Sequence, residues 1–574
     1  MVRVEWRRDE RREIIRSLIV TPAIALSTKG GIAVHSRDVA SADGGIPMRI
    51  LALGLTVICA LSTAARADSV VLYANRVDSE TVALTWSGGT PLYQVFSQGT
   101  PENVASFFNL IDQTAGYSYT DTNAYLSTEF YLVTDGHCAD PSTCPAGPNE
   151  CIIPTCTSGD CGYQSVAQGT VTSNQTPGDC QVNECDGSGN IVSVPDNTDT
   201  PNDNNPCTTD TCQAGVPTFT PVPNGTSCRL GAGTRCRAAM CVPTVDVVRV
   251  GDGSSNLSGF SAPVFIDERY EDGSLESIVS LPTSISGANE PCTLAGTLTS
   301  EGALTRSSDE SFVQFGGYAT PPGTATVAST SSSFVNRVVC RVDPAGAVDS
   351  TTRFNAAFSG SSIRGAASVD GTAFWVSGNS TTSSGGAWYI PRGTTGGTHI
   401  LTTPNDALHV AIYGGQLYGD SGQGMFTNVF TIGSGLPTTA GQTATPLPGL
   451  PATMAAPQGF VMFDLNPNVA GLDTLYIADN RTVALGGGVQ KWTFNGLTWN
   501  LLTTFTSGLT TGPQGITGYV QSNGNVELFV TTSESSGNKL LRYIDDGVTM
   551  NPAPTTISTA ANDTAYRGVA MGAH

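Results

Sequence analysis

Gln514-Gly515-Ile516-Thr517 is one copy of a short element that recurs through residues 244–574, a small apolar strand that opens on a glycine. Four similar copies and one degenerate copy, which has histidine in place of the glycine, are Glu301-Gly302-Ala303-Leu304, Arg364-Gly365-Ala366-Ala367, Leu408-His409-Val410-Ala411 (degenerate), Gln458-Gly459-Phe460-Val461 and Arg567-Gly568-Val569-Ala570. Successive copies lie roughly 45 to 63 residues apart, which is the period of β-propeller blades. We therefore predict a propeller whose opening strands line a crowded central axis.

The last copy, at residues 567–570, leaves no room for the rest of its blade. We expect the missing strands to come from the start of the region, at 247–251, 263–270 and 275–281. The hairpin dipeptide Asp272-Gly273 separates the last two of these. Counting opening strands gives six blades, closed by the C-terminal strand. Seven blades is the alternative, because residues 285–300 are unassigned.

One blade carries a recognisable pattern. Leu475-Tyr476-Ile477-Ala478-Asp479-Asn480, followed by Gly488-Val489-Gln490-Lys491-Trp492, resembles an NHL-type propeller repeat. The resemblance implies that Asp479 ties down a turn rather than binding a metal. The whole region also resembles a C-terminal propeller of unassigned function that is found on other secreted bacterial proteins.

Residues 137–243 hold twelve of the fifteen cysteines and few aliphatic side chains. A segment with so little core needs covalent cross-links, and we expect disulfides rather than zinc, because no C-x2-C pair occurs and only His137 is nearby. The pairing cannot be deduced from spacing. Cys292 and Cys340 are expected to form a further disulfide in the propeller. The twelve cysteines are Cys138, Cys144, Cys151, Cys156, Cys161, Cys180, Cys185, Cys207, Cys212, Cys228, Cys236 and Cys241.

This segment is similar to a cysteine-rich repeat of large secreted bacterial proteins. The stretches that carry the similarity are Gln175-Thr176-Pro177-Gly178-Asp179-Cys180, Cys185-Asp186-Gly187-Ser188-Gly189-Asn190, Asn205-Pro206-Cys207-Thr208-Thr209-Asp210-Thr211-Cys212 and Asn224-Gly225-Thr226-Ser227-Cys228. The similarity implies a spacer without catalytic activity. Asp196, Asp199 and Asp203 gather oxygen ligands in one loop, so calcium is the candidate metal there. The alternative is a solvated turn rich in Asn and Asp.

Residues 68–136 alternate apolar and polar side chains in short runs separated by turns, which predicts a small β-sandwich. The runs Leu84-Thr85-Trp86, Tyr93-Gln94-Val95, Ser118-Tyr119-Thr120-Asp121 and Tyr131-Leu132-Val133 resemble bacterial fibronectin type III domains. We interpret Trp86 as a core residue rather than a sugar-stacking platform, and Tyr131 likewise as a packed residue.

The N-terminal region contains an export signal. Met48-Arg49, the apolar run at 50–61 and Ala65-Arg66-Ala67 form a signal peptide at 48–67, which predicts a mature chain that starts near Asp68 and is secreted or held at the cell surface. Residues 1–47 are then best explained by a start codon assigned too far upstream. The apolar run is too short to span a membrane, so we expect no membrane insertion.

The net charge and the motifs limit the classes of function that are possible. The net charge is −21, and it becomes −25 without residues 1–67, which repels phosphate backbones and argues against nucleic-acid binding. Gly419-Asp420-Ser421-Gly422 resembles the nucleophile loop of trypsin-like proteases, but no histidine stands in a matching motif. Acidic candidates for the channel mouth are Asp267, Glu268, Asp420, Asp464, Asp473 and Asp479.

The sequence therefore favours a secreted, monomeric, non-catalytic protein that presents a propeller to an extracellular glycan or protein partner. No catalytic residue and no required cofactor is assigned. The alternative is a calcium-dependent propeller hydrolase or lyase, for which three or more carboxylates would have to converge at the channel mouth.

Overall fold

The computed structural model describes residues 2–5, 71–76, 81–87, 93–98, 110–114, 118–121, 128–135, 138, 140–534 and 537–574. These residues form two compact units, one of residues 1–202 and 210–218 and one of residues 203–209 and 219–574. The predicted signal peptide at 48–67 and, apart from Val2–Glu5, the predicted extension at 1–47 lie outside the described residues. Nearly every element is a β-strand, and no described helix has the length and apolar character needed to cross a bilayer.

Two small sheets account for the described part of residues 1–135, with strand orders β2-β3-β6 and β1-β7-β4-β5. Trp86 on β3 is only 3% exposed and meets the Tyr93 ring of β4 edge-on, so it is a core residue as expected. The closer assignment to the fibronectin type III fold stays a proposal. The strands are β1 (Val2–Glu5), β2 (Val71–Arg76), β3 (Val82–Ser87), β4 (Tyr93–Gln98), β5 (Leu110–Thr114), β6 (Ser118–Asp121) and β7 (Thr128–Asp135).

The cysteine-rich segment is cross-linked by six disulfides: Cys138–Cys156, Cys144–Cys161, Cys151–Cys185, Cys180–Cys212, Cys207–Cys236 and Cys228–Cys241. The sequence left this pairing open. The elements of the segment are η2 (Pro141–Thr143), β8 (Ile152–Thr157), β9 (Asp160–Ser165), β10 (Gln181–Cys185), β11 (Ile191–Pro195), β12 (Thr208–Gln213), β13 (Val216–Pro221), β14 (Ser227–Leu230), β15 (Gly233–Arg237) and β16 (Met240–Val242).

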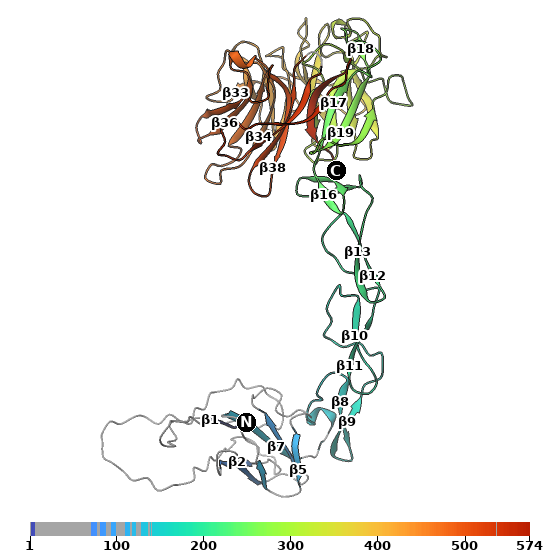
Figure 1. The fold of residues 1–574 in the computed structure, drawn as a ribbon, viewed down its shortest axis with the longest axis vertical. Helices are drawn as coiled ribbons and strands as arrows, with labels where there is room; N and C mark the ends of the chain where they lie inside the picture. The colour runs from blue at the N-terminus through green and yellow to red at the C-terminus, as the bar shows by residue number, and fades with distance from the viewer. Residues whose placement is uncertain are drawn as a thin grey trace, which may run out of the picture. The chain divides into compact units, whose positions relative to one another are not determined.

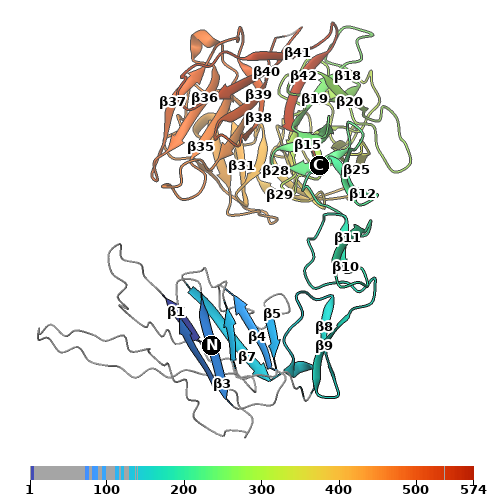
Figure 2. The same cartoon turned by 60° about the horizontal axis from the view of Figure 1, so that its bottom comes forward.

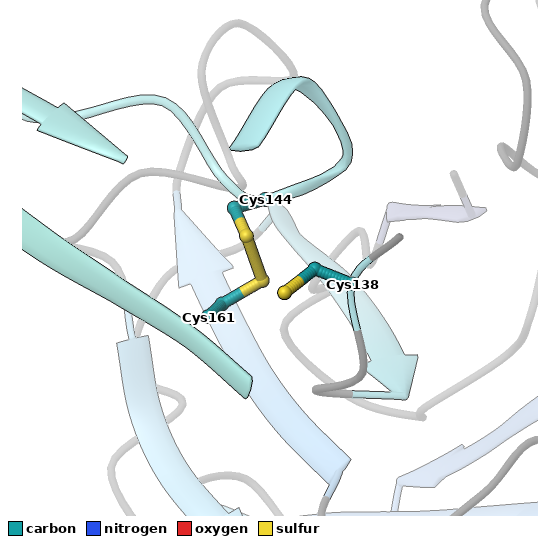
Figure 3. A group of neighbouring side chains, drawn as sticks. All are labelled: Cys138, Cys144 and Cys161. Carbon is teal, nitrogen blue, oxygen red and sulfur yellow. A yellow bond between two sulfur atoms is a disulfide. The ribbon is translucent and has the colours of Figure 1, made fainter. Parts of the chain in front are cut away.

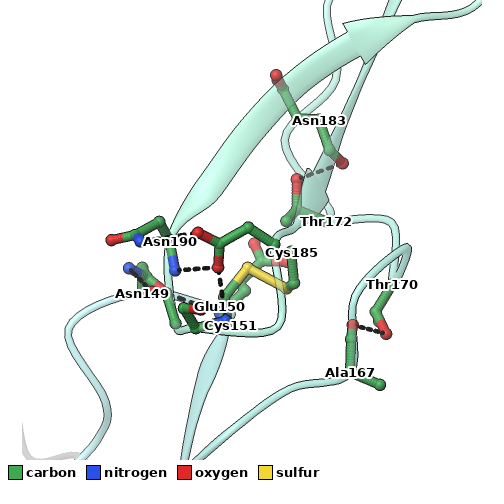
Figure 4. Close-up of a disulfide and its surroundings, with 12 residues drawn as sticks. Asn149, Glu150, Cys151, Ala167, Thr170, Thr172, Asn183, Cys185 and Asn190 are labelled. Carbon is green, nitrogen blue, oxygen red and sulfur yellow. Dashed lines mark hydrogen bonds between the residues drawn. A yellow bond between two sulfur atoms is a disulfide. The ribbon is translucent and has the colours of Figure 1, made fainter.

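Figure 4 shows how one of these bridges replaces a hydrophobic core. The sulfurs of Cys151 and Cys185 are buried, and backbone and side-chain hydrogen bonds surround them. Asn149 accepts a hydrogen bond from the Cys151 backbone N–H at 2.7 Å and donates one to the Gly189 carbonyl at 3.1 Å. The cross-link and the asparagine together hold loops that have almost no aliphatic side chains to bury.

The rest of the chain forms six four-stranded antiparallel sheets (Figures 1 and 2), which is the make-up of propeller blades. Their orders are β20-β19-β17-β42, β22-β23-β24-β25, β26-β27-β28-β29, β30-β31-β32-β33, β34-β35-β36-β37 and β38-β39-β40-β41. Five of these sheets are built from four consecutive strands, so each is a local meander.

The strands of this region are β17 (Thr244–Val250), β18 (Ser261–Ala262), β19 (Val264–Tyr270), β20 (Leu275–Ser280), β21 (Leu294–Ala295), β22 (Thr305–Arg306), β23 (Val313–Tyr318), β24 (Arg337–Val342), β25 (Val348–Phe354), β26 (Ile363–Ala367), β27 (Ala373–Gly378), β28 (Gly386–Pro391), β29 (Thr398–Leu401), β30 (Val410–Tyr413), β31 (Gln416–Ser421), β32 (Asn428–Ile432), β33 (Ala444–Pro446), β34 (Pro457–Phe463), β35 (Thr474–Asp479), β36 (Gly488–Phe494), β37 (Trp499–Phe505), β38 (Pro513–Val520), β39 (Val526–Thr532), β40 (Lys539–Asp545), β41 (Thr555–Thr559) and β42 (Ala565–Met571). Single 3₁₀ turns are η3 (Val327–Ser329), η4 (Gly424–Phe426) and η5 (Val483–Leu485).

The sheet that joins the two ends of this region contains the strands expected from the sequence. The C-terminal strand β42 pairs antiparallel with β17, with Val247 opposite Val569. Figure 1 shows this red strand lying among the green ones. Residues 285–300 hold only the two-residue strand β21, which pairs with β18, so they do not form a further four-stranded sheet.

The opening strand of one sheet differs from the expectation. We expected a strand at 301–304, but β22 comprises only Thr305–Arg306. Gly302 has a φ of +74°, a conformation that suits glycine, and the next residue forms a parallel bridge with Gly365 of the neighbouring sheet. The residues before β22 therefore connect to the next blade instead of extending their own.

Glycines let neighbouring opening strands approach one another. A Cβ atom on Gly568 would lie 2.1 Å from the Leu304 nitrogen and 2.3 Å from the Gly302 carbonyl oxygen, both backbone atoms. The Gly568 N–H donates a hydrogen bond to the same carbonyl. A Cβ on Gly515 would meet the Arg567 carbonyl at 3.1 Å. At Gly568, and less severely at Gly515, the contact between neighbouring sheets leaves no room for a side chain.

The propeller also contains the disulfide expected between Cys292 and Cys340, with a Cα–Cα distance of 6.3 Å. Both cysteines lie in a buried cluster with Val264, Phe315 and Val338. Unlike the bridges of the cysteine-rich segment, this one is embedded in an apolar core.

We predict that Gly568→Ala destabilises the propeller by about 1–3 kcal/mol or more, because the added methyl group collides with backbone that cannot rotate away. Thermal and denaturant unfolding of the two proteins measure the difference. Gly396→Ala is the matched control, since a Cβ there meets no atom within 4 Å. Equal stability of the two variants would contradict the close approach.

A second prediction compares a disulfide of the cysteine-rich segment with the disulfide in the apolar core of the propeller. Removing Cys180–Cys212 by a double serine substitution should cost about 2–4 kcal/mol and expose residues 180–212 to proteases. Replacing Cys292 and Cys340 by alanine should lower the Tm of the propeller while its apolar cluster keeps it folded. Limited proteolysis with mass spectrometry tests both, and uncut 180–212 in the serine variant would oppose the prediction.

Candidate binding site in the propeller channel

A cavity of 460 Å³ lies where the opening strands meet, and its walls come from β22, β26, β30, β34, β38 and β42. This volume is within the range of small-molecule sites. The walls present polar and apolar surface in similar amounts, with Leu304, Val410 and Ile516 beside Arg306 and Glu310 among the lining residues. Since all six sheets contribute, the cavity is the central channel of the propeller.

A histidine and an aspartate form a buried pair beside this channel. His409 lines the cavity and is 8% exposed, while Asp420 is fully buried. The Asp420 carboxylate accepts hydrogen bonds from the His409 backbone N–H at 2.8 Å and from its Nδ1 at 3.1 Å. This contact places the proton on Nδ1, which leaves Nε2 as a hydrogen-bond acceptor when the imidazole is neutral.

Asp420 also has a structural role. Its Oδ2 accepts a hydrogen bond from the Gly459 N–H at 3.0 Å and so links β31 to the next opening strand. Thr531 in another sheet makes an equivalent link, because its hydroxyl donates to the Arg567 carbonyl at 2.6 Å. The neighbouring Ser421 is buried, and its hydroxyl donates to the Asp406 carbonyl at 2.7 Å. Gly419-Asp420-Ser421-Gly422 is therefore a strand end that joins blades.

The residues before the recurring glycines divide into two groups. Glu301, Arg364 and Arg567 have partners: the Glu301 carboxylate accepts from the Ala295 N–H, Arg364 lies 3.1 Å from Asp406, and Arg567 donates to the Gly296 carbonyl. Burial raises the pKa of Glu301 and lowers that of Arg567 to about 10. These three charged residues belong to the framework of the channel mouth.

Gln458 and Gln514 form the second group. Both line the cavity, and the Oε1 atom of each is buried without a hydrogen-bond partner among the described residues. Gln514 is only 4% exposed, and its Nε2 donates to the Tyr566 carbonyl at 3.4 Å. Because a carbonyl can only accept, the Nε2 end of the Gln514 amide must face Tyr566, and the Oε1 end faces away from it. In the sequence these two residues are marked only as members of the repeat, and nothing there predicts that their amide oxygens are unpaired.

Ionic groups lie at the other end of the opening strands. The Glu310 carboxylate accepts hydrogen bonds from Arg306 at 2.9 Å and Arg229 at 3.0 Å, and it lies 3.0 Å from Nε2 of His574. The His574 N–H also donates to the Glu310 carbonyl. Burial is the main cause that lowers the pKa of His574. This network ties the C-terminal residue to the turn after β22.

The acidic candidates for the channel mouth have separate partners. Asp267 pairs with Arg249 at 3.0 Å, Glu268 with Arg235 at 2.7 Å and Asp479 with Arg481 at 2.9 Å. Asp473 accepts from the Leu465 and Asn466 backbone N–H groups, and Asp464 is exposed. Four of these five acids are held by local contacts and Asp464 is exposed. Among the described side chains of the original six, the Asp420 carboxylate is the one that forms a hydrogen bond with a residue lining the channel cavity, whereas Asp473 reaches the lining residue Phe463 through its backbone N–H.

Asp196 and Asp203 each cap a turn, and Asp199 joins two loops that are distant in the sequence. Asp196 accepts from the Thr198 N–H at 2.9 Å, Asp199 from the Gly178 N–H at 2.8 Å, and Asp203 from the Asn205 N–H at 2.8 Å. Hydrogen bonds from Thr198 lower the pKa of Asp196. A calcium site at these residues stays a prediction, which calcium titration of the whole protein tests.

Among the described residues, the groups of three candidate ligands whose atoms lie within 4.8 Å of one another consist of cysteines. One is Cys138, Cys144 and Cys161 (Figure 3), and the other is Cys207, Cys228 and Cys241. All six sulfurs are already in disulfides, and a disulfide sulfur lacks the thiolate that binds zinc. These groups are structural cross-links.

A second cavity of 440 Å³ lies beside the first blade and is lined by Arg235, Asp246, Glu268 and Glu276, among others. Arg235 and Glu268 form a two-point ion pair, and Glu268 also accepts from Thr244. Asp246 on β17 lies opposite Glu268 in the sheet and is 6% exposed. Burial, and then the charge of Glu268, raise its pKa well above the usual value, although Arg235 and Arg306 oppose this.

This raised pKa makes a prediction about stability. The unfolded state releases the Asp246 proton above pH 3.8, whereas the folded state retains it to higher pH, so the residue lowers the free energy of unfolding as pH rises. Asp246→Asn should therefore raise the Tm at pH 7, by about 2 °C for each kcal/mol gained. The difference should vanish near pH 3, and the exposed Asp464→Asn is the control. A Tm difference independent of pH would contradict the assignment.

Comparison with known proteins gives a limited result. No family model and no curated protein matches the chain. Among solved structures, a protein assigned provisionally as a 6-phosphogluconolactonase from Bacteroides uniformis is similar at 12% identity, over 55% of this chain and 82% of that one, with a TM-score of 0.30.

Two further structures are similar at the same level. A nidogen/laminin complex matches at 12% identity over 57% of this chain and 98% of that chain, with a TM-score of 0.34. The extracellular domain of a protein assigned provisionally as a one-component system from B. thetaiotaomicron matches at 11% identity. The match covers 55% of this chain and 35% of that chain, with a TM-score of 0.27. TM-scores this low do not assign a function, so the function is inferred from the residues of this chain.

Proposed function

We propose that this protein is a secreted, non-catalytic binding protein that presents a six-bladed propeller, closed by β42, to an extracellular glycan or protein partner. The six four-stranded sheets and the pairing of β42 with β17 support the closed ring. The seven disulfides support export, because such cross-links persist in oxidising compartments. The sandwich, as a fibronectin type III-like domain, and the cysteine-rich spacer would carry the propeller.

The observation that carries the proposal is the channel cavity with hydrogen-bonding groups left unused. Buried polar atoms are nearly always paired in a folded protein, so two amide oxygens without partners in one cavity favour a ligand there. The rest of the wall combines apolar side chains with further polar ones, so it can both pack against a ligand and bind it through hydrogen bonds. The acids predicted for a metal-dependent hydrolase are instead engaged in ion pairs and turns.

The alternative of a hydrolase has one observation in its favour. The His409–Asp420 pair has the arrangement of a general base and the carboxylate that orients it. A nucleophile or a metal-bound water would still be required. We rank this reading second, because the carboxylates that would hold calcium do not contact the cavity.

A glycan array probed with the full-length protein, followed by turnover assays on every bound glycan with and without calcium, tests the proposal. We expect saturable binding to at least one class of glycan, or to a purified extracellular protein, with no product formed. Product that appears at a rate dependent on His409 or on calcium would instead establish the hydrolase.

A further inference from the structure

We propose that the channel mouth binds the terminal sugar of a glycan, end-on, through acceptors supplied by His409, Gln458 and Gln514. This inference rests on the proposed function and specifies its ligand. The three residues line one cavity and come from the starts of three successive opening strands, β30, β34 and β38. Each of the three stands at the start of the first strand of its sheet, so their side chains belong to the same end of the channel.

The chemistry of the three groups selects a hydroxyl-bearing ligand. Nε2 of His409 is an acceptor, because its Nδ1 is held by Asp420, and the Oε1 atoms of both glutamines accept. A ligand for this end must therefore donate several hydrogen bonds. Sugar hydroxyls donate, and they carry no charge that the cavity would have to desolvate.

Charge at the mouth supports a neutral ligand over an ionic one. Arg364 is paired with Asp406, and Arg567 lies near Glu301, whose charge acts on its pKa. Asp420 is buried and receives hydrogen bonds from His409 and Gly459. Each charged group therefore has a countercharge or a backbone partner, although the Nε–H groups of Arg364 and Arg567 are buried without a hydrogen-bond partner in the described part of the chain, as are the two amide oxygens.

The shape of the site indicates recognition of a chain end. Strands from all six sheets surround the cavity, so a ligand enters along the channel axis and not from the side. Tyr413 lies on the wall and is partly exposed, so it can supply aromatic surface for the carbon face of a sugar ring, while the Phe460 ring, 6.0 Å away, is buried in the core behind it. A terminal sugar can enter such a site, while an internal sugar, with chain on both sides, cannot.

Competition experiments with the unmodified protein test the inference directly. Array hits should share one terminal sugar, and the free methyl glycoside of that sugar should displace them. The same oligosaccharides with the terminal sugar O-methylated should not bind, because methylation removes the donors. Binding of glycans that share only an internal sugar, or of the O-methylated forms, would overturn the inference but leave the proposed function intact.

Variants locate the site. Gln458→Leu and Gln514→Leu each remove one acceptor at similar volume, and each should weaken binding of the methyl glycoside about tenfold. Gln423→Leu, an exposed glutamine outside the cavity, is the matched control. Circular dichroism and Tm establish that the variants are folded. Unchanged affinity in both cavity variants would place the ligand elsewhere, and the absence of any sugar binding by the unmodified protein would end the inference and leave only a protein partner for the proposed function.

Discussion

The backbone contact between β42 and the residues before β22 is the constraint on which the propeller depends. Gly568 lies against Gly302 and Leu304 with no space for a side chain, and β42 pairs with β17, which lies more than three hundred residues earlier in the chain. Such a contact is nonlocal and forms only when the intervening sheets are in place. The same small residues that permit the approach leave an axial cavity instead of a filled core.

Much of this architecture follows from the sequence, because the blade repeat is local. Strands that open on glycine at blade spacing predict four of the six opening strands, and the degenerate copy with His409 predicts a fifth. The hairpin dipeptides indicate where the strands that follow are joined. The exception is the segment at 301–304, where the backbone bridges to Gly365 of the next sheet, a contact that no local pattern encodes. The disulfide pairing could not be predicted either, because the spacing of twelve cysteines does not determine which of them are joined.

The candidate site was harder to predict, because its glutamines are distinguished by the absence of hydrogen-bond partners among the described residues, which a sequence does not reveal. Glu301, Arg364, Gln458, Gln514 and Arg567 occupy the same place in the repeat, and nothing in the sequence says that the charged ones have partners while the amides do not. A glutamine before the glycine in two successive copies was the available signal. The pairing of His409 with Asp420 joins residues eleven positions apart across a hairpin, which the degenerate copy concealed.

The order of the bridges in the cysteine-rich segment has one more consequence. The loops closed by Cys138–Cys156, Cys144–Cys161, Cys151–Cys185, Cys180–Cys212, Cys207–Cys236 and Cys228–Cys241 overlap in turn, so every peptide bond from 138 to 241 is spanned by at least one disulfide. A single proteolytic nick anywhere in this tether therefore leaves its two fragments covalently attached. A pulling force would likewise be carried by both the backbone and the disulfides. Separating the two ends of the segment therefore requires breaking at least one peptide bond and at least one disulfide bond.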